Sequence, residues 1–220
     1  WRMRAFIISV IILLTGCVGQ AFEVEDQKIF GGQGNGFTLR IISTADINYF
    51  APIIDTFRNT HPDVKIDYTV ASSTQVMQAI YTEKQPFDVV ISSAMDLQTK
   101  LANDGFALKH TSTFTQNLPN WAVWNDMVFA FTQEPAGIVI SNKLFEGRAI
   151  PKNRQELINT LRQSPKRFEG RVGTYDIRKS GVGYLFATQD ARASDTYWRL
   201  TEVMGTLDPK LYCCASDMIN

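Results

Sequence analysis

The sequence predicts an α/β protein in which mostly parallel sheets are flanked by helices. Strand-like and helix-like segments alternate as β-α-β-α-β between residues 37 and 105, which is the pattern of a parallel sheet with covering helices. Segment 87–92, FDVVIS, is apolar on both faces, as a central parallel strand should be. Pro135 then interrupts an apolar stretch and predicts a break between two lobes.

The first lobe is expected to span residues 37–133. Its first helix carries apolar residues at the i, i+3, i+4 and i+7 spacing of one buried face, namely Phe50, Ile53, Ile54 and Phe57. The predicted strands are 37–43, 64–70 and 87–92, and the predicted helices are 48–59, 74–84 and 96–105, the last ended by Gly105.

The second lobe is expected to span residues 134–220. Predicted strands flank the break at 127–133 and 137–143, and the elements beyond are a helix at 153–163, a strand at 171–177 and helices beginning at 180 and 195. A second sheet with only two candidate strands is not expected to close a core. We therefore expect the second lobe to be incomplete.

The N-terminus resembles an export signal, and we assign residues 1–21 to it. Arg4 precedes an apolar run over residues 5–14, which is too short to span a bilayer and has the size of a signal-peptide core. Leu14-Thr15-Gly16-Cys17 resembles a bacterial lipobox, which predicts lipidation of Cys17. Cleavage after Gly19-Gln20-Ala21 and a buried N-terminal helix are the alternatives. Residues 22–36 are polar and Gly-rich, which predicts a flexible tether.

Charge and cysteine content exclude some classes of protein. Lys plus Arg and Asp plus Glu both total 22, so the basic face of a nucleic-acid-binding protein is not expected. Cys213 and Cys214 are adjacent, and they form either a vicinal disulfide or two buried free thiols. The sequence contains no GxSxG, HExxH or SxxK motif and no Cys/His metal spacing, which argues against an enzyme.

Three strand-to-helix turns of the first lobe each carry a pair of hydroxyl side chains, and two of the turns also carry an aspartate. Ligands of open parallel sheets bind outside the carboxyl ends of the strands, where helix N-termini favour acceptors and anions. Helix capping alone is the alternative explanation for each turn. The candidate ligand-binding residues from these turns are Ser43, Thr44, Asp46, Ser72, Ser73, Thr74, Ser92, Ser93 and Ala94.

A fourth candidate turn lies in YDIRKSGVGY, residues 175–184 of the second lobe. Ser180 and Gly181 open a helix there, and Arg178 precedes them, so these three residues are expected to reach over a ligand. N-capping by Ser180 and a solvated Arg178–Lys179 pair are the alternatives. Hydroxyl donors favour an oxyanion, whereas Asp46 and Asp96, if they point inward, favour an amine or a metal.

Three segments resemble the extracellular solute-binding proteins of bacterial ABC importers, closest to the ferric-ion, phosphonate and polyamine subgroup. They are LRIISTADINYFAPIIDTFRNTHPDVKIDYTVASSTQVMQAI, QPFDVVISSAMDLQTKLANDGFAL and IPKNRQELINTLRQSPKRFEGRVGTYDIRKSGVGY. The resemblance implies a two-lobed type II periplasmic-binding-protein fold that closes on its ligand by hinge motion. It also implies ligand contacts from the four turns.

The resemblance further implies capture of a small polar or anionic solute without catalysis and its delivery to an ABC permease in the inner membrane. We expect a monomer in the periplasm or at the cell surface, with membrane contact only through a lipid anchor at Cys17 and no cofactor of its own. A ferric ion or a metal-bound anion is among the ligands that the resemblance allows. The alternative function is a periplasmic ligand sensor that reports to a membrane-bound signalling partner.

Overall fold

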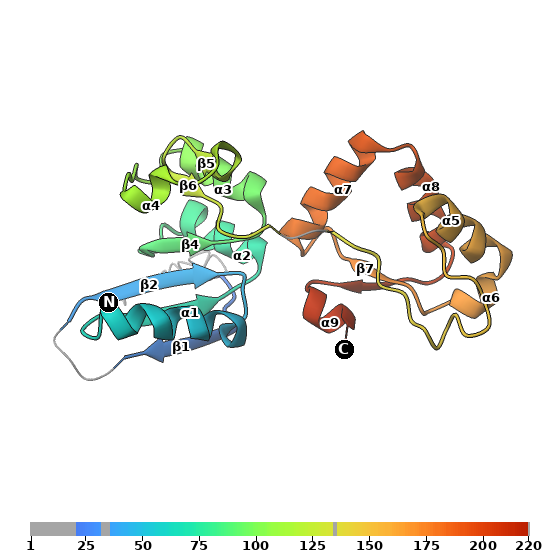
Figure 1. Ribbon diagram of the computed structural model, residues 1–220, viewed down its shortest axis with the longest axis horizontal. Coiled ribbons are helices and arrows are strands. Elements are labelled where there is room, and N and C mark those ends of the chain that lie inside the picture. The colour runs from blue at the N-terminus through green and yellow to red at the C-terminus, as the bar shows by residue number, and fades with distance from the viewer. Residues whose placement is uncertain (1–20, 32–35, 134–135, 220) are drawn as a thin grey trace, which may run out of the picture.

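The computed structural model describes residues 21–31, 36–133 and 136–219, which form two lobes joined near residue 135 (Figure 1). We refer to the described residues up to 133 as lobe one and to those from 136 onward as lobe two. The predicted export signal and Cys17 lie outside the described residues. Within the described ranges, no helix combines the length and the apolar character that crossing a membrane requires.

Lobe one is built on a four-stranded sheet in the order β1-β3-β2-β4, in which β2, β3 and β4 are parallel and β1 is antiparallel to β3. The strands are β1 (Asp26–Phe30), β2 (Thr38–Ser43), β3 (Lys65–Val70) and β4 (Val89–Ile91). The helices are α1 (Ile47–Thr60), α2 (Ser73–Met77), which continues into the π-helical turn η1 (Gln78–Thr82), and α3 (Met95–Asn103). The shorter elements are α4 (Thr113–Gln116), η2 (Asn120–Ala122) and the antiparallel pair β5 (Val123–Trp124) and β6 (Val128–Phe129).

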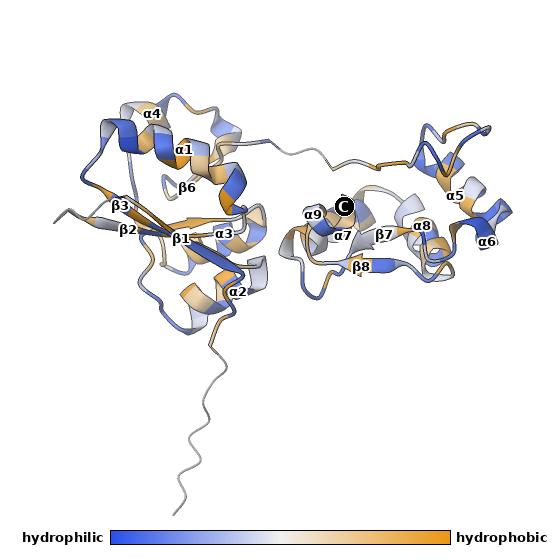
Figure 2. Ribbon diagram, turned by 90° about the horizontal axis from the view of Figure 1, so that it is seen from below, coloured by the Kyte–Doolittle hydropathy of each residue, from blue (hydrophilic) through white to orange (hydrophobic). Residues whose placement is uncertain are grey.

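Helices cover both faces of this sheet because its strands are apolar on both sides. Ile41 belongs to a cluster with Ile54 of α1, whereas the neighbouring Ile42 belongs to a cluster with Val76 of α2 and Leu101 of α3. Successive side chains of a strand point to opposite faces, so these two clusters are the two halves of the core. Figure 2 shows the same arrangement, with α1 and α2 on opposite sides of the apolar strands.

The register of the parallel strands places their carboxyl ends at one level. Ser43 pairs with Val70 of β3 on one side and with Ile91 of β4 on the other, and each of these is the last residue of its strand. The three following turns therefore begin side by side along one edge of the sheet, as the sequence predicted. This alignment allows residues from all three turns to act at one site.

Two expectations for lobe one are corrected at the ends of the sheet. Asp26–Phe30 lies in the segment expected to be a flexible tether, yet it forms strand β1, because its backbone pairs with that of β3 and Phe30 enters the core. The strand predicted at 87–92 is shorter and lies at the edge of the described sheet, not at its centre. Val89 is correspondingly exposed.

The predicted inward face of the first helix is also partly wrong. Ile54 is buried as expected, but 53% of the surface of Ile53 and 38% of that of Phe57 are exposed. Ile47, which precedes the predicted helix, is buried instead. The helix begins earlier than expected and packs through the stripe of Ile47, Ala51 and Ile54, which shares one face at the i, i+4, i+7 spacing.

Lobe two combines a small parallel sheet with a helical core. Its elements are α5 (Arg154–Gln163), α6 (Pro165–Phe168), β7 (Gly173–Tyr175), α7 (Gly181–Ala193), α8 (Thr196–Gly205), β8 (Lys210–Tyr212) and α9 (Ala215–Ile219). β7 and β8 pair in parallel. The core is formed by side chains that include Ile158 of α5, Phe168 of α6 and Val203 of α8.

The strands predicted around the break between the lobes differ most from the structure. Only Val128–Phe129 of the segment 127–133 is a strand, and it pairs with β5. Segment 137–143 forms no strand among the described residues, and Ile138 and Val139 are exposed there. The residues of this segment favour a β-strand, but no strand among the described residues pairs with it. Conversely, β8 was not predicted, and it exists because it pairs with β7.

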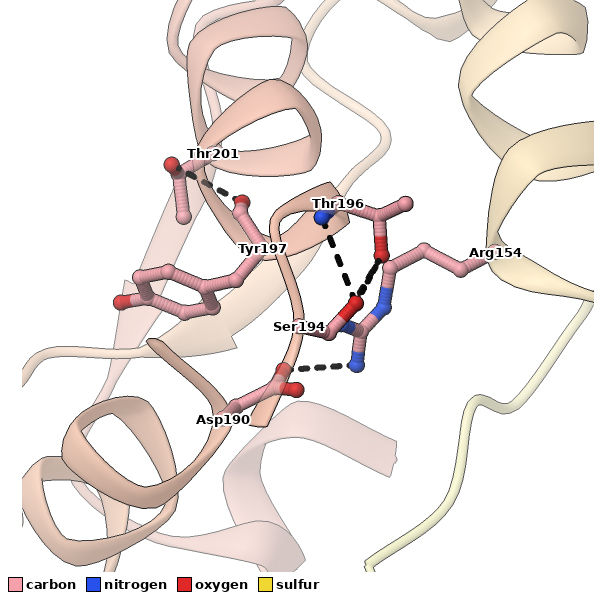
Figure 3. A network of polar contacts seen from close by, with 6 residues as sticks. All are labelled: Arg154, Asp190, Ser194, Thr196, Tyr197 and Thr201. Carbon is pink, nitrogen blue, oxygen red and sulfur yellow. Dashed lines mark hydrogen bonds and ion pairs between the residues drawn. The ribbon is translucent and has the colours of Figure 1, made fainter. Parts of the chain in front are cut away.

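A polar network in lobe two joins the ends of three helices (Figure 3). Arg154 at the start of α5 donates through Nη2 to Oδ2 of Asp190 of α7 at 2.6 Å and through Nη1 to Oγ1 of Thr196 of α8 at 3.3 Å. The hydroxyl of Thr196 also contacts that of Ser194 at 2.7 Å. About two thirds or more of the Arg154 and Asp190 side chains are covered, so this ion pair is better shielded from water than a surface pair. The network fixes α7, whose N-terminus faces lobe one.

We expect Arg154→Ala to lower the free energy of unfolding of lobe two by about 1–2 kcal/mol, since two charge-assisted hydrogen bonds are lost. Arg162→Ala is the matched control: Arg162 lies on the same helix and pairs with Glu202 at 3.3 Å, but both side chains are at least half exposed. That substitution should cost about 0.5 kcal/mol or less. Urea denaturation followed by circular dichroism measures both, and equal losses would contradict the special role of Arg154.

Candidate functional site

The three turns at the sheet edge of lobe one are tied together by backbone hydrogen bonds. The N–H of Ala71 donates to the carbonyl of Ser43 at 3.0 Å, and the N–H of Thr44 donates to the carbonyl of Ile91 at 3.0 Å. Oγ1 of Thr44 accepts a weaker hydrogen bond from the N–H of Ser93 at 3.4 Å. The turns that the sequence predicted to form one site are thus neighbours in space.

Ser43 in the first turn is a structural residue. Its surface is 0% exposed, and its Oγ accepts a hydrogen bond from the N–H of Ala45 at 3.0 Å. The hydroxyl of Tyr68, on β3, donates to the carbonyl of Ala45 at 2.8 Å. Burial is the main reason that the pKa of Tyr68 is raised, which keeps this hydroxyl protonated as a donor. The two hydrogen bonds to Ala45 fix the turn, in which Thr44 and Asp46 are more accessible than Ser43.

The hydroxyls of the second and third turns also accept hydrogen bonds from their own backbone. Ser72 is the N-cap of α2, and its Oγ accepts from the N–H of Gln75 at 3.4 Å and contacts Oγ1 of Thr74 at 3.1 Å. Oγ of Ser92 accepts from the N–H of Ala94 at 3.2 Å. The capping alternative is therefore confirmed for Ser72. It does not exclude ligand binding, because a hydroxyl that accepts one bond can still donate another.

Ser93 differs from its neighbour because it is exposed. Ala94 occupies the N-cap position of α3 and Asp46 that of α1, and neither makes a side-chain capping bond. Neither helix is therefore capped by the hydroxyls that precede it. Among the candidates of lobe one, those that are not fully buried are Thr44, Asp46, Ser72, Thr74, Ser92 and Ser93.

Lobe two reaches these turns through the first residue of α7, Gly181. A Cβ atom added to Gly181 would lie 2.4 Å from Cβ of Ser73 and 3.2 Å from Cβ of Ala94. No side chain fits at 181 in this arrangement, so the bare backbone of α7 packs directly on the starts of α2 and α3. Ser73 and Ala94, both predicted as ligand contacts together with Gly181, lie against Gly181 in this arrangement.

Ser180 is the N-cap of α7, since its Oγ accepts a hydrogen bond from the N–H of Gly183 at 3.1 Å. Gly183 packs inside lobe two: a Cβ there would lie 2.4 Å from Cβ of Tyr175 on β7. Gly181 and Gly183, which are separated by one residue, therefore have different roles. Gly181 permits the contact between the lobes, and Gly183 permits the contact between α7 and its own sheet.

Arg178 is occupied by an intramolecular partner. Its guanidinium donates through Nε to Oδ1 of Asp176 at 2.8 Å and through Nη2 to Oδ2 at 2.7 Å, and its backbone N–H adds a bond to Oδ1 at 3.1 Å. These bonds lower the pKa of Asp176 to about 2. The pair fixes the loop that leads to Ser180. Arg178 and Lys179 are both exposed, which agrees with the alternative of a solvated surface pair, and Arg178 in addition pairs with Asp176.

Acidic side chains gather near Asp46 at the same edge. The pKa of Glu25, which immediately precedes β1, is raised first by burial, then by the negative charges of Asp46 and Glu23 and by that of Asp217 of lobe two. Asp217 belongs to α9, so carboxylates from both lobes face this region. The sequence pointed to Asp46 but missed Glu25, because residues 22–36 were expected to be a tether and not part of the sheet.

Asp96 lies elsewhere. It lines a groove of about 460 Å³ between α3 and α7, together with Lys100 of α3, Asp104 just after α3, and Leu185 and Gln189 of α7. Nζ of Lys100 forms an ion pair with Oδ2 of Asp104 at 2.6 Å in this groove. Asp46 and Asp96, which the sequence treated alike, therefore lie in different surroundings.

Comparison with known proteins places this arrangement among binding proteins. A family model described as bacterial extracellular solute-binding protein matches residues 43–209. The solved structure of the substrate binding protein of the ABC transporter from Agrobacterium tumefaciens has 31% sequence identity and a TM-score of 0.85, and the match covers 88% of this chain and 59% of that one.

A second solved structure, the ferric binding protein from Campylobacter jejuni, has 18% identity and a TM-score of 0.56 over 82% of this chain and 57% of that one, which is a similarity of fold. The chain thus spans less than two thirds of the length of either protein. No curated protein sequence matches it.

We expect Gly181→Ala to separate the lobes with little effect on the stability of either, because its methyl group meets Ser73 of the opposite lobe. Gly183→Ala is the matched control. It should leave the separation unchanged and lower the free energy of unfolding by about 1–3 kcal/mol, since its methyl group meets Tyr175 of the same lobe. Small-angle X-ray scattering measures the separation, and denaturation measures the stability.

The double variant Ser73→Gly/Gly181→Ala tests the same contact by compensation. It removes the side chain with the closest approach to residue 181, so the scattering profile should return toward that of the unmodified protein. If Gly181→Ala alone leaves the profile unchanged, the proposed contact does not hold the lobes together in solution.

The Asp176–Arg178 pair predicts a pH dependence of stability in the acid range. The folded pKa of Asp176 is about 2, below its ordinary value of 3.8, so its contribution is complete above about pH 4 and is lost as the pH falls toward 2. Thermal unfolding between pH 2 and pH 5 should show a steeper loss for the unmodified protein than for Asp176→Asn. Identical slopes would show that the pair contributes nothing to folding.

Proposed function

The chain belongs to the family of bacterial extracellular solute-binding proteins, and from this premise we propose that it captures a small polar solute between its two lobes and delivers it to an ABC permease in the inner membrane. The observation that carries the proposal is the meeting of three strand-end turns of lobe one with the N-terminus of α7. Such a junction offers hydroxyls and helix N-termini from two bodies that can move relative to each other.

The proposed contacts are the accessible residues of these turns. Thr44, Ser72 and Ser93 present hydroxyls at the edge of lobe one, with Thr74 and Ser92 beside them. Ser43, Ser73, Ala94, Ser180 and Gly181 are buried and support the site by fixing its turns. Arg178 acts through Asp176 and not on the solute. Closing the lobes would exclude water, and each hydrogen bond to the solute would then contribute more than it does in water.

Charge supports a solute that carries a positive group. The pKa of Glu25 is raised by its burial and, to a smaller extent, by the negative charges of Asp46 and Glu23 of lobe one and of Asp217 of lobe two, so carboxylates of both lobes interact here. A purely anionic solute would meet their negative potential on both sides of the gap. An amine or a zwitterion would be attracted to it, and the hydroxyls would hold its other polar groups.

Delivery to a permease is supported by the name of the Agrobacterium tumefaciens protein, which is the substrate binding protein of an ABC transporter. The apolar leader supports export. Lipidation of Cys17 stays a prediction, since that residue lies outside the described part of the chain.

We expect an amine or zwitterionic solute to raise the melting temperature of the protein, whereas anions of matched size should not. A solute at 100 times its Kd stabilises the folded state by about 2.7 kcal/mol, which corresponds to about 5–10 °C for a chain of this size. Ser92→Ala/Ser93→Ala should abolish most of this shift. Thermal denaturation over a panel of amines, zwitterions and anions measures it.

The control for the serine variant is Ser112→Ala. Ser112 caps α4, outside the three turns, so its substitution removes a capping hydroxyl from the same lobe without touching the proposed site. It should lower the melting temperature slightly and leave the solute-dependent shift intact. A shift that survives in the double variant would disprove the assignment of the turns, and a panel without any active solute would disprove the function.

A further inference from the structure

Three metal-ligating side chains come together where the second strand of lobe two ends. β8 ends at Tyr212, the chain bends through Cys213 and Cys214, and α9 brings Asp217 back over them. One ligand atom from each of Cys213, Cys214 and Asp217 lies within 4.8 Å of the others. The two cysteines form a vicinal disulfide. They are half-buried, which corrects the alternative of two buried free thiols.

We propose that, once the disulfide is reduced, Cys213, Cys214 and Asp217 bind a thiophilic divalent metal ion such as Zn²⁺. Two thiolates and a carboxylate are a ligand set that suits this ion, and three protein ligands leave a fourth position for water or another ligand. The inference does not depend on the proposed function, because all three ligands lie within residues 213–217 of lobe two.

The distance between a sulfur atom and the carboxylate agrees with binding of a single metal ion by these side chains. Zn–S bonds of about 2.3 Å and Zn–O bonds of about 2.1 Å at a tetrahedral angle separate the sulfur and oxygen atoms by about 3.6 Å. Sγ of Cys213 lies 3.6 Å from Oδ2 of Asp217. After reduction the two sulfur atoms would move apart, to about 3.8 Å in the same geometry.

The position of α9 is set by packing, so Asp217 is held in place. A Cβ added to Gly173 of β7 would lie 3.2 Å from both Cγ of Met218 and the ring of Tyr212. The helix therefore lies close against β7 and the end of β8. Asp217 follows Cys213 and Cys214 by four and three residues, a separation that brings it back to the side of the bend that carries the sulfur atoms.

The surroundings favour a cation. Asp217 is exposed and lies near enough to Glu25 of lobe one to raise its pKa. The negative charges of this region would attract a metal ion.

The redox step balances with a dithiol reductant. The reductant gives two electrons and two protons to the Cys213–Cys214 bond, which becomes two thiols, while the reductant becomes a disulfide. Zn²⁺ then displaces the two thiol protons and binds the thiolates. In the oxidised form the thiolates do not exist, so the disulfide switches the site off.

The test is metal binding by the reduced and oxidised protein in a Cys17→Ser background, so that only Cys213 and Cys214 supply thiols. Isothermal titration with Zn²⁺ alone, and ultraviolet thiolate-to-metal absorption with Cd²⁺, should show one ion per reduced chain and none per oxidised chain. Cys213→Ser and Cys214→Ser should each abolish the absorption band or weaken binding by more than roughly tenfold, and Asp217→Asn should weaken binding by roughly tenfold.

Asp208→Asn is the matched control for the carboxylate. Asp208 is exposed, belongs to the same lobe and precedes β8, whereas Asp217 follows it. This variant removes the same charge and should leave binding unchanged. Binding that persists in both cysteine variants would show adventitious carboxylate sites and overturn the proposal. Equal binding by Asp217→Asn and the unmodified protein would remove Asp217 from the ligand set.

Discussion

The close approach of bare backbone at Gly181 to the starts of α2 and α3 is the contact on which the rest of the arrangement depends. It joins lobe two to the strand-end turns of lobe one, and it exists because no side chain stands between them. The contact requires the turns of lobe one and the helix α7 of lobe two to be held in place. The common register of the parallel strands aligns the turns, and the Arg154 network holds the far end of α7.

The serine-rich turns combine buried hydroxyls that accept backbone hydrogen bonds with more accessible neighbouring residues. Ser43 and Ser180 are buried and satisfy backbone N–H groups. Thr44 and Ser93 are more accessible, and they connect two turns through one long hydrogen bond. A turn needs both kinds of residue, because a ligand contact is useful only if the backbone that carries it is fixed.

Local sequence patterns correctly predicted two kinds of element: helix ends that depend on nearby residues, and strands that are covered by helices on both faces. The parallel strands of lobe one, the N-caps Ser72 and Ser180 and the left-handed Gly105 just after α3 follow from such patterns. Strands whose existence depends on a distant partner were missed or overstated, as β1, β8 and the segment 137–143 show. The Asp176–Arg178 pair and the carboxylates around Glu25 depend on tertiary placement, which residue spacing alone does not encode.

The separation of supporting and accessible residues within each turn has an evolutionary consequence. Ser43 cannot change without disturbing its fully buried position, whereas Ser93 is exposed in the neighbouring turn, whose backbone bonds to Thr44. Selection can therefore exchange the outer hydroxyls for other polar groups while the strands, caps and lobe contact stay intact. Under the proposed function, such a scaffold would allow solute preference to change while the architecture stays the same.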